Sequence, residues 1–194
     1  LDCWGNSFDS LDLSGCTSLV SFSLVGSRGQ LTALNLSGCT GLESIDLSGS
    51  SGRLTTLDLS GCTSVTSFVF DGGNSFATVD LGGCTGLTEL QIFYASVASL
   101  DVSGCSGLKT LICINRHLRS LDVTGCTALE TLECMDNQLT ALDVSGCNAL
   151  TSLECVRNQL TALDVSGCVA LTSLDCYDNQ LTSLNVAGCT ALKH

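Results

Sequence analysis

The chain has 194 residues, a net charge of −12, and only 7 Lys and Arg side chains. This acidic balance excludes a nucleic-acid-binding surface and disfavours docking on anionic membranes, because both depend on a cationic face. The sequence is too apolar for a disordered chain, and no run of 18 apolar residues is present to insert into a membrane. We therefore expect a folded domain with an acidic surface.

A hexapeptide close to Leu-Asp-Val-Ser-Gly-Cys recurs along the whole chain and sets the order of its elements. It begins at nine places: Leu11, Leu34, Leu57, Val79, Leu100, Leu121, Leu142, Leu163 and Leu184. Successive starts are 23, 23 and 22 residues apart, and from Val79 onward they are 21 residues apart. Extra residues fall within 26–30 and 49–53, so we expect the first four coils to be irregular and the rest to be regular.

Each repeat contains two short stretches with the two-residue period of a β-strand. In the repeat that starts at Leu150, counted as position 1, apolar residues fall at positions 1, 4, 6, 11, 14, 16 and 19. Positions 4 and 6 alternate with polar neighbours, as do positions 14 and 16. One unit cannot bury its own apolar side chains, so the units must stack, roughly 4.8 Å apart.

This periodicity predicts an all-β-rich solenoid that forms a single domain over residues 1–194. We expect about nine coils by the motif count. A parallel sheet should cover one face, with short extended segments and turns on the other, and with little or no helix. Neither end shows the polar capping coil that solenoids need for solubility. We therefore expect either a longer natural chain or ends that stack on other chains.

The pattern L-x-x-L-x-L/C-x-x-N-x-L resembles the leucine-rich-repeat family. The 21-residue form, with Cys at position 6 and a following L-x-x-L-D-V stretch, is similar to the cysteine-containing repeats of internalin-like bacterial surface proteins. The resemblance covers essentially the whole chain and is specific from Leu108 onward. It implies a parallel sheet on one face, an extracellular or cell-surface location, and adhesion or binding to a protein or a glycan.

Fourteen cysteines occupy two positions of the repeat. Position 19 holds Cys16, Cys39, Cys62, Cys84, Cys105, Cys126, Cys147, Cys168 and Cys189, and position 6 holds Cys3, Cys113, Cys134, Cys155 and Cys176. Other coils have Leu, Phe or Ile at position 6, so we predict buried free thiols that pack as small apolar residues. The alternative is a ladder of disulfides or metal ions. Disulfides need converging Cβ vectors, which stacked parallel side chains lack, and the sequence has no C-x-x-C pair for zinc.

Two polar positions also recur. Position 9 is Asn at Asn6, Asn137, Asn158 and Asn179, where a side chain can bond the backbone of its own coil and of the neighbouring coil. Position 15 forms a column of Asp12, Asp58, Asp80, Asp101, Asp122, Asp143 and Asp164, with Asn35 and Asn185 interleaved. We predict that each of these side chains accepts hydrogen bonds from the Ser-Gly turn after it. A calcium-binding column of oxygen ligands is the alternative.

Positions 3, 5, 7 and 8 point away from the core on the first strand and vary between coils. A run of apolar residues there, with aromatic anchors and a polar rim, is typical of a protein interface. The candidate ligand-binding residues are Phe93, Tyr94, Ile112, Ile114, Met135, Val156, Arg157 and Tyr177. The rim would consist of Glu133, Asp136, Glu154, Asp175 and Asp178, together with Arg157. The alternative is that these residues pack against another domain or a neighbouring molecule.

A local basic cluster is a second candidate site, and it comprises Lys109, Arg116, His117 and Arg119. It could hold an anionic group. The alternative is that these side chains solvate a turn or pair with neighbours such as Glu89 and Glu130.

Nothing in the sequence indicates catalysis, a cofactor or a metal. The chain has two histidines and lacks a G-x-S-x-G elbow, an H-E-x-x-H motif and a phosphate-binding loop. Stacked carboxylates share one environment, whereas acid–base pairs need unlike environments. We predict a non-enzymatic recognition module that is secreted or on the cell surface and binds a protein or glycan. The alternative is a spacer or fibre segment with end-to-end self-association; an engineered array, and ice binding through Thr140, Thr161 and Thr182, are two further hypotheses.

Overall fold

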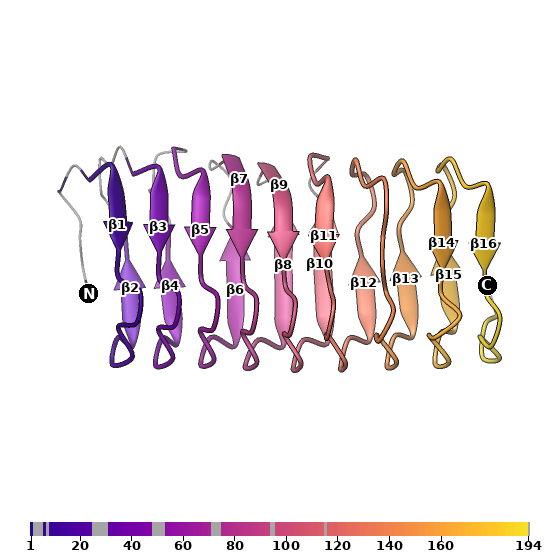
Figure 1. The fold of residues 1–194 in the computed structure, drawn as a ribbon, viewed down its shortest axis with the longest axis horizontal. Helices are drawn as coiled ribbons and strands as arrows, with labels where there is room; N and C mark the ends of the chain where they lie inside the picture. Colours follow the sequence, from indigo (N-terminus) through magenta and orange to yellow (C-terminus); the bar gives the residue numbers. More distant parts are fainter. Residues whose placement is uncertain are drawn as a thin grey trace.

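The chain folds into a stack of coils, as the computed structural model shows for residues 1, 6, 8–24, 31–47, 53–70, 75–93, 96–114 and 116–193. In this described part the elements are sixteen short β-strands, without a helix. The coils follow one another along a single axis from the N-terminal end to the C-terminal end (Figure 1). The predicted solenoid is confirmed. It makes about seven turns, where the motif count predicted about nine.

Strands that contain position 14 form one side of the solenoid, which we call the aspartate sheet because position 15 lies on it. Six of them pair in parallel in the order β1-β3-β5-β7-β9-β11, and β14 and β16 form a separate parallel pair. Their bounds are β1 (Ser10–Asp12), β3 (Ala33–Asn35), β5 (Thr56–Asp58), β7 (Ser75–Asp80), β9 (Ser96–Asp101), β11 (Ser120–Asp122), β14 (Ala162–Asp164) and β16 (Ser183–Asn185). The register places Leu11, Leu34 and Leu57 side by side, so residues one period apart are neighbours, as predicted.

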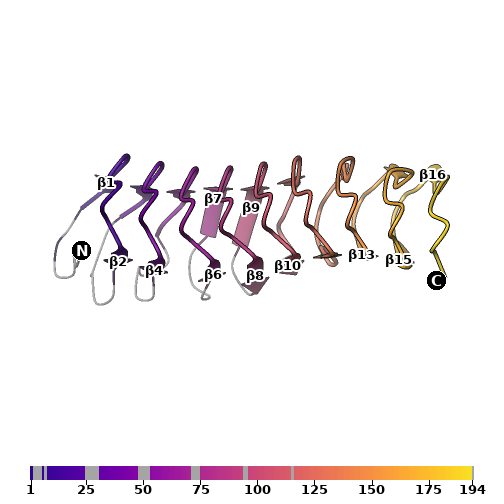
Figure 2. The same cartoon turned by 90° about the horizontal axis from the view of Figure 1, so that it is seen from below.

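Strands that contain position 4 form the opposite side, which we call the variable sheet. Six strands pair in parallel in the order β15-β13-β12-β10-β8-β6, and β2 pairs with β4. Their bounds are β2 (Ser21–Ser23), β4 (Ser44–Asp46), β6 (Ser67–Phe70), β8 (Glu89–Phe93), β10 (Thr110–Ile114), β12 (Thr131–Glu133), β13 (Ser152–Glu154) and β15 (Ser173–Asp175). Both sides of the coil are therefore hydrogen-bonded sheets, where the sequence predicted a sheet on one face and short extended segments and turns on the other. The two rows of strands lie on opposite sides in Figure 2.

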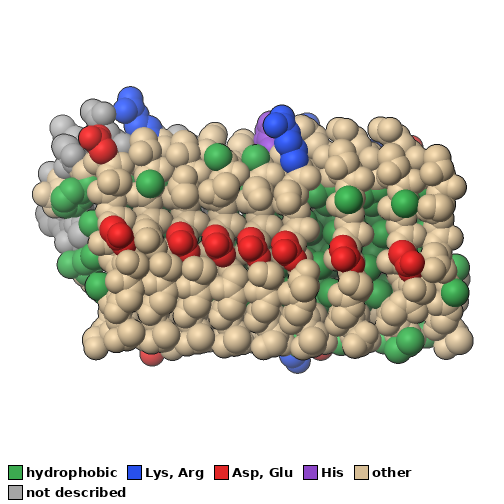
Figure 3. Space-filling view, in the orientation of Figure 1, with side chains coloured by type: hydrophobic (Ala, Val, Ile, Leu, Met, Phe, Trp, Pro, Cys, Tyr) green, Lys and Arg blue, Asp and Glu red, His purple; other side chains and the backbone are tan. Residues whose placement is uncertain are grey.

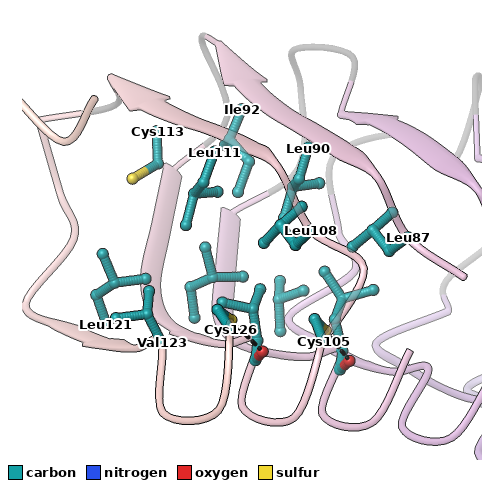
Figure 4. Packing of buried hydrophobic residues seen from close by; sticks show 14 of the residues in the cluster. Leu87, Leu90, Ile92, Cys105, Leu108, Leu111, Cys113, Leu121, Val123 and Cys126 are labelled. Carbon is teal, nitrogen blue, oxygen red and sulfur yellow. Dashed lines mark hydrogen bonds between the residues drawn. The ribbon is translucent and has the colours of Figure 1, made fainter. Parts of the chain in front are cut away.

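The core is a file of apolar side chains between the two sheets. In the middle coils, Leu90, Ile92, Leu108 and Leu111 are fully buried, and each lies over its equivalent in the next coil (Figure 4). Burying one such side chain contributes roughly 1.5–3 kcal/mol of hydrophobic stabilisation. Since the coils are too short to enclose a core alone, this stabilisation depends on the stacking.

The cysteines at position 19 add a hydrogen bond to this packing. The Sγ of Cys62 donates to Leu36 O at 3.1 Å, and the Sγ of Cys126 donates to Val102 O at 3.1 Å. Each acceptor belongs to the preceding coil, so the thiols bond the coils to one another; the thiols of Cys105 and Cys126 lie in such a file in Figure 4. All described cysteines are free, and the prediction of buried thiols holds except at Cys16, which is exposed, and Cys176, which is half-buried.

Because of the buried cysteines, the stability of the fold should decrease at alkaline pH. Burial raises the pKa of several thiols above their ordinary value of 9.0, to about 11 at Cys62, Cys105 and Cys147 and to about 12 at Cys126 and Cys155. Between these values and 9.0 the folded chain holds more protons than the unfolded chain. The contribution of these thiols to the free energy of unfolding is therefore fully present below pH 9, and it is lost as the pH rises toward 11.

Urea unfolding under reducing conditions at pH 8 and at about pH 10.5, which lies between the unfolded and the raised thiol pKa values, measures this loss. A Cys105→Ala/Cys126→Ala variant serves as the control, because it lacks two of the shifted thiols and should lose less stability over the same interval. Equal losses in the two proteins would show that the thiols do not carry the effect.

Candidate ligand-binding face

Asparagine side chains at position 9 shape the corner where the chain leaves the variable sheet. Asn158 is 7% exposed, and its Nδ2 donates to Cys134 O of the preceding coil at 2.9 Å and to Cys155 O of its own coil at 3.0 Å. Its Oδ1 accepts the Leu139 amide at 3.0 Å. Asn137 and Asn179 make the corresponding bonds. The predicted bonding within and between coils is thus confirmed, and it fixes the residues just before the corner.

The residues before these asparagines adopt a left-handed backbone. The φ angles are 54° at Asp136, 52° at Arg157 and 54° at Asp178. For a residue other than glycine or asparagine this backbone conformation costs of the order of 1 kcal/mol or more, so contacts with the surrounding residues must hold the backbone in place. The corner asparagines supply those contacts. They present position 8 of three successive coils at one edge of the sheet.

At this edge Arg157 is the centre of a charged cluster with Asp136, Tyr177 and Asp178. The guanidinium lies 3.6 Å from Asp136 Oδ1, 3.6 Å from Asp178 Oδ2, and 5.8 Å from the centroid of the Tyr177 ring. Exposed ion pairs of this kind add little stability. Their effect is to orient the Arg157 side chain and to hold the exposed Tyr177 ring beside it. We call these four residues the Arg157 cluster.

Next to this cluster, three carboxylates line up on the outer face of the variable sheet. Strand pairing places Glu133 beside Glu154 and Glu154 beside Asp175. All three are half-buried. Burial raises the pKa of the Glu133 carboxyl, and the neighbouring Glu154 carboxylate raises it further. Among the described residues none of the three takes part in an ion pair, so this column keeps an uncompensated negative charge.

The apolar residues predicted for this face are only partly exposed. Ile112, Ile114 and Met135 are half-buried, whereas Tyr177 projects with 53% of its surface exposed. The predicted exposure of Val156 is wrong, since only 4% of its surface is accessible. Backbone bonds from Asp136 to Val156 and from Arg157 to Tyr177 place it between two neighbouring coils. Met135 and Tyr177 hold the equivalent position in the coils on either side.

Two further predicted residues lie near the limit of what the structure describes. Phe93 ends β8, and its backbone pairs with Ile114 of β10. Tyr94 lies outside the described residues. The face that the structure brings together therefore extends from Ile112 to Tyr177, with Arg157 at its edge.

The predicted basic cluster divides between two sides of the coil. Lys109 precedes β10 in the variable sheet and pairs with Glu130 at 3.6 Å, as the alternative interpretation predicted. Arg119 precedes β11 in the aspartate sheet, where its Nε donates to Gln138 Oε1 at 3.2 Å. Arg116 and His117 are exposed at the corner between them. The four side chains do not converge on one anion.

The aspartate sheet uses its carboxylates within the fold. Each Oδ1 of position 15 accepts the backbone amide two residues later, at 2.8 Å for Asp101 with Ser103 and at 2.9 Å for Asp58 with Ser60. Asn35 and Asn185 accept the same bond through their side-chain oxygens. The predicted turn bonding is thus confirmed. Gly104, which follows in this turn, has a φ of 69°, a region that favours glycine.

A break in this sheet was not predicted. From Leu13 to Val102, the amide at position 16 donates to the position-15 carbonyl of the next coil, as in Val102 N to Asp122 O at 3.0 Å. Within 116–193, all of it described, the Val123 and Val144 amides make no such bond, and the ladder resumes at Val165 with Asn185 O. A surface cavity of about 410 Å³ opens at the break, lined by Arg119, Ser120, Leu121, Asp122, Thr124, Thr140, Ala141 and Asp143. In Figure 3 hydrophobic surface shows between the acidic side chains toward this end.

Comparisons with known proteins agree with the repeat assignment. Residues 115–131 match a family model described as Leucine Rich repeat. The repeat between residues 115 and 131 is therefore of the leucine-rich-repeat type. Among solved structures, the solenoid is similar to the functional domain of InlJ from Listeria monocytogenes, which includes a cysteine ladder, at 25% identity and a TM-score of 0.47. The match covers 99% of this chain and 51% of that one, so the chain spans about half the length of the InlJ domain.

Two other solved structures are similar to the solenoid. A leucine-rich-repeat protein of Leptospira interrogans matches at 16% identity with a TM-score of 0.44, over 90% of this chain and 76% of that chain. An internalin of Listeria monocytogenes, InlF, matches at 18% identity with a TM-score of 0.41, over 91% of this chain and 66% of that chain. A search of curated protein sequences gives no match.

The described part of the solenoid lacks two other kinds of feature. No helix in it has the length and apolar character needed to cross a membrane. No group of three or more His, Cys, Asp or Glu side chains in it is arranged to hold a metal ion.

Proposed function

We propose that the solenoid is a non-enzymatic recognition module that presents the variable sheet to a protein partner. The observation that carries this proposal is the combination of Tyr177, the half-buried apolar residues Ile112, Ile114 and Met135, and the oriented Arg157 on one continuous sheet face. Aromatic and Arg side chains beside apolar surface are the groups that dominate binding energy at protein interfaces. We further propose a secreted or cell-surface location, because the cysteine-containing repeat resembles that of internalin-like surface proteins.

The rigidity of the face supports the proposal. Strand pairing from β6 to β15 and the asparagine bonds at the corners fix the backbone before any partner arrives. A surface ordered in advance loses little conformational entropy on binding. The aspartate sheet presents nearly the same residue in every coil and uses it for its own turns, so it offers less to distinguish one partner from another.

The test is binding of the chain to a panel of purified extracellular proteins and glycans, measured by biolayer interferometry. A Met135→Ser/Tyr177→Ser variant should lose binding of the protein partner by at least about tenfold, since interface anchors typically contribute more than 1–2 kcal/mol each. Val169→Ser is the matched control, because Val169 is 58% exposed but lies in the turn after position 19. Binding that survives the double substitution would contradict the proposal, as would sedimentation that shows only self-association of the chain.

A further inference from the structure

The column of Glu133, Glu154 and Asp175 suggests what kind of partner the variable sheet takes, provided that the proposed recognition function holds. We propose that this sheet binds a basic protein surface, whose Lys or Arg side chains meet the column while its apolar residues meet Ile112, Ile114, Met135 and Tyr177. This assigns a charge and a composition to the partner.

The first reason is that no cation in the described part of the chain neutralises the three carboxylates. Neighbouring strands are about 4.8 Å apart, so the three carboxylates repel one another along the column. In the described part of the chain none of them accepts a side-chain hydrogen bond or pairs with a cation. The nearby Arg157 guanidinium does not compensate them, because it lies between Asp136 and Asp178. A cationic side chain from a partner would relieve the repulsion of two neighbouring carboxylates at once.

The second reason is the contrast with the aspartate sheet. That sheet also stacks carboxylates in register, as in Asp80 beside Asp101. There each carboxylate holds a turn amide, so it has a role inside the fold. The Glu133 column has no such role, and it lies beside the projecting Tyr177 ring and the half-buried apolar residues. Carboxylates without a role inside the fold therefore lie beside apolar surface on the variable sheet, and a basic, partly apolar protein segment complements both.

The experiment compares two triple variants of equal net charge. Glu133→Gln/Glu154→Gln/Asp175→Asn removes the column. Asp122→Asn/Asp143→Asn/Asp164→Asn removes three charges from the opposite sheet, and Asn35 and Asn185 show that asparagine keeps the turn bond there. The probes are a synthetic peptide that alternates Lys with Leu and Phe, and its counterpart with Glu in place of Lys. Circular dichroism checks that both variants fold, and titration calorimetry measures binding.

We expect the basic peptide to bind the wild type and the Asp122 triple variant within about twofold of each other, and the Glu133 triple variant at least about tenfold more weakly, because interface charges act locally. The wild-type Kd should rise with salt, and the acidic peptide should not bind. Equal weakening in both triple variants would overturn the proposal, since the attraction would then come from net charge alone. Calcium binding that is lost with the column, or glycans from the panel that require it, would also overturn the proposal.

The two proposals fail separately. One outcome is that binding of panel proteins still requires Met135 and Tyr177 while the basic peptide binds the Glu133 triple variant as tightly as the wild type. In that case the recognition function stands and the proposal of a basic partner fails. If the Met135→Ser/Tyr177→Ser variant keeps all panel binding, the recognition function itself fails.

Discussion

Replacing Asn158 with Ala is expected to lower the free energy of unfolding by about 2–4 kcal/mol, since a buried amide left without a partner costs about 1–3 kcal/mol and each further lost hydrogen bond about 0.5–1.5 kcal/mol. The side chain accepts the Leu139 amide, and it shares the Cys134 carbonyl with Asn137 and the Cys155 carbonyl with Asn179. Alanine removes the acceptor and both donated bonds from a site that water reaches poorly. The corner that carries Arg157 loses its support at the same time.

Urea unfolding followed by circular dichroism measures this loss. Gln159→Ala is the matched control, because Gln159 is the next residue and is exposed; it should change stability by no more than about 0.5 kcal/mol. If Asn158→Ala also cost less than about 1 kcal/mol, a typical value for a single hydrogen bond, the asparagine ladder would not stabilise the corner as described.

Replacing Leu111 with Ala is expected to cost about 2–5 kcal/mol, the range for truncating a fully buried leucine that leaves a cavity. Leu111 lies in register between Leu90 and Leu132, both of which are also fully buried. Strand pairing on both sides limits how far the coils can close around the cavity. The cost should therefore fall in this range rather than below it.

The control for Leu111 is Leu174→Ala, which removes the same atoms at the same position of a later coil. Leu174 is only half-buried, so the loss there should be clearly smaller. Equal losses in urea unfolding at the two positions would indicate that coil stacking does not set the contribution of a leucine.

Much of the fold was predictable because residues one period apart become neighbours. The repeat predicted the files of leucine and cysteine, the turn bonds of position 15 and the asparagine bonds at position 9. The sequence shows the strand period at positions 14 and 16 as well, but it did not predict a second paired sheet, because three-residue strands such as β3 and β5 leave little to distinguish a paired strand from an extended segment. The burial of Val156 was missed because burial at this position depends on the adjacent coils, which the pattern of one coil does not contain.

The break in the aspartate sheet could not be predicted from local sequence. Residues 100–105 and 142–147 have the same sequence, Leu-Asp-Val-Ser-Gly-Cys. In the first, Val102 donates to the next coil, whereas in the second, Val144 does not. The difference therefore arises from the surrounding coils. The break lies in the same coils as the buried asparagine corners, whose side chains bond neighbouring coils to each other at the edge of the variable sheet.

Because the aspartate sheet is interrupted while the variable sheet continues from β6 to β15, we expect two kinds of mechanical behaviour along the solenoid. Between β1 and β11 hydrogen bonds join the coils in the aspartate sheet, which makes that segment resistant to bending. Between β11 and β14, adjacent coils are tethered mainly along the variable sheet, so we expect them to pivot about that edge while the far side spreads. Bending strain is then taken up by the open side, and the spacing of the side chains from Ile112 to Tyr177 stays constant as the rod flexes.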